Sequence, residues 1–195
     1  MATKVEICNM ALQELGANRI INLTESREEA VLCNLFYETA RDEVLRKLAP
    51  NFADWYQSLA QVSSDDANYM LSDLDEWEYQ YALPVSPYCL RVLGIPDYPN
   101  QPYVIANRYL LTNLEEVTIK YTQRVEDEAK FDPLFIRALS YRLAMDLTDK
   151  ITNSRKTRAE VQALYNWAVG EATLIDAVEG KHEELEDTWV DAGRS

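Results

Sequence analysis

The spacing of apolar residues changes twice along this chain, and these changes limit the possible folds more than any other feature of the sequence. From Thr3 to Leu48 and again from Asp132 to Val178, apolar residues recur at intervals of three or four, which is typical of amphipathic helices. Between Trp77 and Tyr121 they alternate with other residues, which is typical of strands. Because no helical pattern separates the strands, the sequence predicts an α+β protein and not a parallel α/β sheet.

The two N-terminal helices have recognisable start and stop signals. Thr3 and Glu6 have the spacing of a capping box, and Gly16 ends the first helix after Leu15. The second helix is expected to end before Pro50, because a residue that precedes proline is disfavoured in the helical conformation. Its apolar stripe consists of Cys33, Phe36, Tyr37, Ala40, Val44 and Leu48.

Two further helices are expected at the C-terminal end. Asp132 is a good N-cap and stands directly before Pro133, which suits the first helical position. The last helix begins near Ser154 or Thr157 and ends at Gly180, and the short link before it predicts an antiparallel helix pair. Its helical spacing predicts a buried stripe of Val161, Leu164, Tyr165, Ala168, Ala172, Ile175 and Val178.

The middle of the chain predicts a small antiparallel sheet. Strands are expected at residues 77–83, 89–95, 103–106, 109–112 and 117–121, and Asn107-Arg108 has the position of a hairpin turn. Prolines between these segments indicate loops and exposed sheet edges. Upstream, the spacing of Phe52, Trp55, Tyr56, Leu59 and Val62 fits a short helix.

Together these patterns predict a mainly α member of the α+β class with a single domain of residues 1–195. The N-terminal and C-terminal helix pairs, residues 1–50 and 131–180, form a four-helix bundle. Residues 77–124 form a small central β insert. Residues 181–195 are rich in Asp and Glu and are expected to be an extended, flexible acidic tail.

Composition excludes several classes of function. The formal net charge of −14 opposes DNA binding through Lys and Arg. No apolar run reaches the roughly 18 to 20 residues of a membrane span, and the N-terminus lacks a secretory signal, so we expect a protein that stays in the cytosol. Cys8, Cys33 and Cys89 have neither disulfide nor metal-site spacing and are expected in the core.

A search for catalytic chemistry finds no specific motif. His182 is the sole histidine and lies at the start of the acidic tail, away from the rigid neighbours that a general base needs. The five glycines are scattered, so no phosphate-binding loop is indicated. Asp73-Leu74-Asp75-Glu76 lacks the glycine of a calcium loop. We therefore expect no enzyme, no cofactor and no metal site.

One enzymatic alternative stays open. A cell-wall or polysaccharide glycoside hydrolase needs only two carboxylates on either side of the glycosidic bond. Asp65, Asp66, Asp73 and Glu76 are candidates for such a pair. A second alternative is a helical module that binds another protein.

The aromatic residues favour a binding role. The chain has twelve tyrosines and four tryptophans, and these residue types are favoured at protein interfaces. Tyr98, Tyr103 and Tyr109 lie in the predicted insert and are candidate contacts. Trp189 is a large aromatic residue in a hydrophilic tail and is a candidate docking anchor.

The order of several segments resembles the head-to-tail adaptor (connector) family of tailed phages, in particular its tail tubular protein A-like members. The similarity covers residues 4–180. It rests on six segments in the same order: Ile7-Cys8-Asn9-Met10-Ala11-Leu12-Gln13-Glu14-Leu15-Gly16, Tyr81-Ala82-Leu83-Pro84, Cys89-Leu90-Arg91-Val92, Phe131-Asp132-Pro133-Leu134-Phe135, Arg142-Leu143-Ala144 and Ile151-Thr152-Asn153-Ser154.

The resemblance implies a structural subunit at the head–tail junction of the virion, assembled in the host cytoplasm. A dodecameric ring of such subunits docks under the portal protein and carries the next tail component, a tail tube or nozzle protein. It also continues the DNA channel, so DNA is passing cargo. The resemblance makes Leu185, Trp189 and Val190 candidate portal contacts, and Tyr98, Tyr103 and Tyr109 candidate contacts between subunits.

The tail assignment predicts the effect of a truncation. Deletion of residues 181–195 should leave the thermal unfolding of the protein nearly unchanged, because few large apolar residues are lost. It should weaken docking to the portal, measured by co-sedimentation with purified portal rings. Equal docking by the truncated and full chains would refute the role of the tail.

Overall fold

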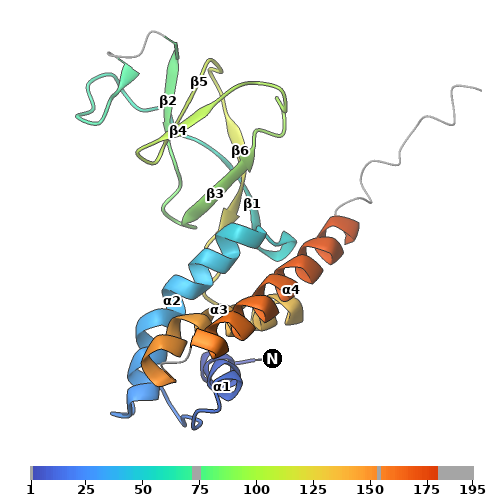
Figure 1. Ribbon diagram of the computed structural model, residues 1–195. Coiled ribbons are helices and arrows are strands. Elements are labelled where there is room, and N and C mark those ends of the chain that lie inside the picture. Colours follow the sequence, from blue (N-terminus) through green and yellow to red (C-terminus); the bar gives the residue numbers. More distant parts are fainter. Residues whose placement is uncertain (1, 72–75, 153–154, 180–195) are drawn as a thin grey trace, which may run out of the picture. The chain divides into compact units, whose positions relative to one another are not determined.

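The computed structural model describes residues 2–71, 76–152 and 155–179 (Figure 1). The chain divides into two compact units. The helical unit comprises Met1–Val44, Pro50–Phe52 and the chain from Asp127 onward. The sheet unit comprises Leu45–Ala49 and Ala53–Glu126.

Four α-helices lie in the described residues: α1 (Lys4–Glu14), α2 (Glu28–Leu48), α3 (Pro133–Ile151) and α4 (Arg155–Glu179). Helix α2 contributes to both units, since its residues up to Val44 belong to the helical unit and its last turn belongs to the sheet unit. Two short 3-10 helices, η1 (Asn51–Ala53) and η3 (Glu128–Lys130), precede β1 and α3. The expected positions of these four α-helices are therefore confirmed.

The start signals read from the sequence act as predicted. The Thr3 side chain accepts from the Glu6 backbone N–H, and the Glu6 carboxylate accepts from the Thr3 N–H at 2.7 Å, which completes the capping box. Asp132 caps α3 by accepting from the Leu134 N–H at 2.7 Å. Gly16 has a φ of +65°, a left-handed conformation that glycine adopts without strain and that ends α1.

The core of the helical unit is built around α3. Helix α3 contacts both α1 and α4. It buries one apolar face: Phe135, Ala138, Leu139, Leu143, Ala144 and Leu147. Phe52 and Phe131 add to this core, with ring centroids 5.2 and 4.8 Å from that of Phe135. Arg142 of α3 bonds Glu43 of α2 at 2.7 Å, so α2 is also held to α3.

The sheet unit contains two antiparallel sheets. In the first, β6 (Thr118–Gln123) pairs with β1 (Asp54–Ser58) and β3 (Cys89–Gly94). In the second, β5 (Tyr109–Thr112) pairs with β2 (Tyr79–Ala82) and β4 (Val104–Ala106). Their shared core consists of Tyr81, Leu83, Cys89, Ile95, Leu110, Val117, Ile119 and Tyr121.

The β4–β5 hairpin forms as predicted. Its two turn residues, Asn107 and Arg108, have φ values of 46° and 65°. Positive φ at both central residues is typical of the type I′ turn, whose twist matches that of the flanking strands. The guanidinium of Arg108 also donates to the Pro84 carbonyl at 2.9 Å, which ties the turn to the loop after β2.

Two expectations about the fold are wrong. The sequence predicted a four-helix bundle, formed by the N-terminal and C-terminal helix pairs, with a small central β insert. The structure is instead a mixed α+β fold, in which two three-stranded sheets form their own compact unit. The short helix expected from Phe52 to Val62 is a strand, β1. Trp55 and Tyr56 adopt the extended conformation because β1 pairs with β6. Strand β6 lies some sixty residues later in the chain.

The cap of α3 generates a stability prediction. Asp132→Ala should lower the free energy of unfolding by about 1 kcal/mol, because the Leu134 N–H loses its acceptor at the start of the central helix. Asp132→Ser, which keeps an acceptor, should lower it much less. Urea unfolding followed by circular dichroism measures both. Equal losses in the two variants would contradict a capping role.

Candidate protein-interaction surfaces

Helix α4 leaves much of its apolar surface uncovered. Val161, Tyr165 and Ala168 are buried against the helical unit. Leu164, Ile175 and Val178, which the sequence predicted to be buried with them, are exposed, so that prediction is wrong. The exposed fractions of its large apolar residues are 37% for Leu164, 49% for Trp167, 70% for Leu174, 49% for Ile175 and 71% for Val178.

These five residues form one continuous stripe. At 3.6 residues per turn they fall within an arc of about 100°, beside the buried face of the helix. From Leu164 to Val178 the stripe is about 21 Å long, since each helical residue rises 1.5 Å. We call these five residues the α4 stripe. A contiguous apolar surface of this kind is typical of a protein contact.

Contacts within the helical unit hold both ends of the α4 stripe. The guanidinium of Arg137 on α3 lies 6.0 Å from the ring centroid of Trp167, within the range of a cation–π contact. Near the other end, the Asp176 carboxylate accepts from the Asn51 backbone N–H at 3.2 Å. The stripe is therefore presented on an anchored helix.

The sheet unit exposes apolar residues on two edge strands. Trp55 and Tyr56 are exposed on β1, and Val104 and Ile105 are exposed on β4. Both strands lie at the edge of their sheets. Edge strands present unpaired backbone groups and are common sites of association.

The structure places the three candidate tyrosines differently. Tyr98 is 51% exposed in the loop after β3. Tyr103 is partly buried and packs against the core of the sheet unit, and Tyr109 begins β5 opposite Ala82 and Ala106. Tyr98 is thus the best placed of the three to touch another protein. Leu185, Trp189, Val190 and His182 lie outside the described residues.

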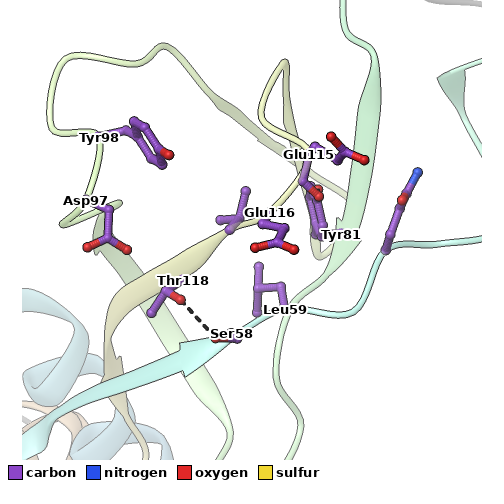
Figure 2. Close-up of a pocket in the computed structure, with 10 residues that line it drawn as sticks. Ser58, Leu59, Tyr81, Asp97, Tyr98, Glu115, Glu116 and Thr118 are labelled. Carbon is purple, nitrogen blue, oxygen red and sulfur yellow. Dashed lines mark hydrogen bonds between the residues drawn. The ribbon is translucent and has the colours of Figure 1, made fainter.

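A hollow in the sheet unit gathers three carboxylates (Figure 2). Its volume is about 410 Å³, and Asp97, Glu115 and Glu116 line it together with Tyr81 and Tyr98. The Tyr81 hydroxyl donates to the backbone carbonyls of Leu114 and Glu115 at 2.7 and 2.6 Å. Burial raises the pKa of Tyr81, which keeps this hydroxyl protonated as a donor.

The geometry of this hollow gives little support to a hydrolase. Figure 2 shows that the Glu115 and Glu116 side chains point apart, and that Asp97 comes from a separate loop. All three residues are exposed to solvent. A general acid in a glycoside hydrolase needs an environment that keeps its carboxyl group protonated, which water does not provide.

The carboxylates considered from the sequence are not better placed. Asp65 and Asp66 are exposed in a turn, where Asp66 accepts from the Asn68 backbone N–H at 2.8 Å. Glu76 is exposed as well, and Asp73 lies outside the described residues. Asp65, Asp66, Glu76 and the three carboxylates of the hollow are all exposed, so none of these described residues is a buried acid beside an ionised partner.

The three thiols are core residues, as predicted from the sequence. Cys8, Cys33 and Cys89 are buried and reduced. A hydrogen bond with Cys33 and burial raise the pKa of Cys8, and burial raises the pKa of Cys89. Thiolates are the reactive form of cysteine, so a raised pKa opposes nucleophilic chemistry at these two positions.

The described residues offer neither a metal-binding cluster nor a membrane-spanning helix. Among them no three His, Cys, Asp or Glu side chains are grouped so that they could hold a metal ion. None of the helices in the same part of the chain has the length and apolar character needed to span a membrane.

Comparison with known proteins does not assign a family. No family model matches the chain, and no match is found among curated proteins. The resemblance to phage head-to-tail adaptors therefore stays a prediction.

Trp167 and Leu174 are surface residues that were not predicted from the sequence. A signal was available: the apolar residues of α4 cover an arc of about 180°, nearly twice what one packed face of a helix requires. Periodicity alone does not say which half of such an arc the rest of the chain will cover.

Burial of the thiols generates a reactivity prediction. At pH 8 a thiol reagent such as dithionitrobenzoate should label none of the three cysteines in the folded protein, and all three after unfolding in guanidinium. Val85→Cys, at an exposed position of the sheet unit, should add one rapidly labelled thiol as a control. Fast labelling of the unchanged chain would show that a cysteine is accessible.

Proposed function

We propose that this chain is a non-enzymatic connector subunit of a tailed phage. In this proposal its copies form a ring under the portal, attach the next tail component and continue the DNA channel. The order of sequence segments motivates the proposal. The exposed apolar surfaces of both units are the observation that carries it.

A ring requires that one face of a subunit meets a different face of the next subunit. The α4 stripe provides an apolar surface for an adjoining component of the particle. Edge strands β1 and β4 of the sheet unit provide others. A subunit with several distinct apolar surfaces suits both lateral contacts and contacts with neighbouring rings.

The charge of the chain agrees with a conduit for DNA. Its net charge is −14. An acidic wall repels phosphates over about a Debye length, roughly 8 Å at physiological salt, and so does not retain passing DNA.

A helical protein-interaction module is the second candidate, since the α4 stripe alone would serve it. The two candidates differ in their partners. A connector binds the portal ring of its own phage, whereas a regulatory module forms a stable complex with a cellular protein and none with a portal.

Electron microscopy tests the proposal directly. Purified protein mixed with its portal rings should add one ring of density, and native mass measurement should give the number of bound subunits. The sequence resemblance predicts twelve. If the protein does not bind the portal at any tested concentration, the proposal fails.

A substitution on an edge strand tests the role of the sheet unit. Ile105→Asp on β4 should lower the affinity for ring assembly on the portal about tenfold, because it places a charge in an apolar contact. Val85→Asp, at an exposed loop position of the same unit, is the matched control and should assemble normally. Sedimentation with portal rings measures both, and melting curves should be little changed. Equal assembly by both variants would exclude β4 from the interface.

A further inference from the structure

The charges around the α4 stripe restrict what can cover it. From Ala159 to Glu179 the chain contains no Lys or Arg. Its charged residues in this span are all acidic: Glu160, Glu171, Asp176 and Glu179. Glu171 lies within the arc of the stripe and at its midpoint, seven residues from both Leu164 and Val178. The Arg137 guanidinium of α3 lies against Trp167, near the Leu164 end. The stripe is therefore an apolar surface with a negative centre and a single basic neighbour among the contacts described for it.

Charge disfavours the tail of this chain as the occupant. Residues 181–195 contain five acidic residues and two basic ones. Folding this segment onto the stripe would bring its carboxylates toward Glu171. Like charges in close proximity are destabilising, most of all where apolar contacts exclude water.

Charge also disfavours a second copy of α4. In an antiparallel pair of stripes the midpoints coincide, so Glu171 faces Glu171. In a parallel pair Glu160 and Glu171 each face their own copies.

We propose that the α4 stripe docks an amphipathic helix of a different protein, with apolar residues on one face and Lys or Arg beside them. Such a helix matches a straight stripe of about 21 Å, because its apolar residues recur at the same intervals of three and four. Its cations meet Glu171 and Glu160, the acidic residues that fall within the arc of the stripe. The inference deepens the proposed function by naming the kind of partner that the stripe binds. It rests on the proposed function in one respect: an adjoining phage component is taken as the source of the helix.

A pair of synthetic peptides tests the chemistry of the occupant. The probe is an 18-residue helix with Leu at the a and d positions of each heptad and Lys at the flanking positions, labelled with fluorescein. Its control has Glu in place of every Lys. In fluorescence anisotropy with the full chain, the Lys peptide should bind at least tenfold more tightly than the Glu peptide. Raising the salt concentration from 50 to 500 mM should weaken its binding.

Three variants locate the binding site. Leu174→Gln combined with Val178→Gln should weaken binding of the Lys peptide at least tenfold, and both positions are exposed, so the fold should persist. Leu35→Gln, at an exposed position of α2, is the matched control and should bind normally. Glu171→Lys should reverse the preference and favour the Glu peptide. Circular dichroism melts check that every variant is folded.

Three results would overturn the inference. The first is equal binding of both peptides. The second is unchanged binding of the Lys peptide by the Leu174→Gln, Val178→Gln variant. The third is self-association of the unchanged chain that this variant abolishes, which would make a second copy the occupant.

The portal assay separates failure of this inference from failure of the proposed function. If the Leu174→Gln, Val178→Gln variant binds the Lys peptide as tightly as the unchanged chain does, and the unchanged chain still adds a ring to the portal, only the docking inference fails. If the Lys peptide binds the stripe and no portal binds, only the connector function fails.

Discussion

The helical unit depends on the burial of α3. Its apolar face contacts both α1 and α4, and the Arg142 guanidinium holds α2 through Glu43. Helix α4 adds only Val161, Tyr165 and Ala168 to the buried apolar residues of this unit. The remaining apolar residues of α4 are not required for that packing, so they are available to another molecule.

The sheet unit reaches a similar result by a different route. Two three-stranded sheets enclose a small core around Tyr81, Ile119 and Tyr121, and each sheet has two edges. A sheet with only one inner strand leaves most of its strands at an edge. Apolar residues at the edge strands β1 and β4 are thus a direct outcome of building a unit from two narrow sheets.

Local signals in the sequence were sufficient wherever a structure is determined by neighbouring residues. The capping pair Thr3 and Glu6, the Asp132-Pro133 start and the Asn107-Arg108 turn were all identified because their hydrogen bonds or dihedral angles involve adjacent residues. Strand β1 was missed because its partner is β6. The exposure of Leu164 and Val178 was missed because periodicity shows which face of a helix is apolar. It does not show whether another part of the chain packs over that face. The carboxylate hollow was also not predicted, since Asp97 and Glu116 come from different loops that only the folded sheets bring together.

The division of the chain has a consequence for its synthesis. The strands of the sheet unit all lie between Ala53 and Glu126. In contrast, α1 and α3 are joined in one core although nearly 130 residues separate their starts. During translation the strands emerge as one uninterrupted stretch and can pair while α3 is still inside the ribosome. Helices α1 and α2 are synthesised before α3. Until α3 emerges, the apolar side chains that they bury in the folded unit stay exposed. The N-terminal segment is therefore the part of the helical unit whose core residues wait longest for their packing partner.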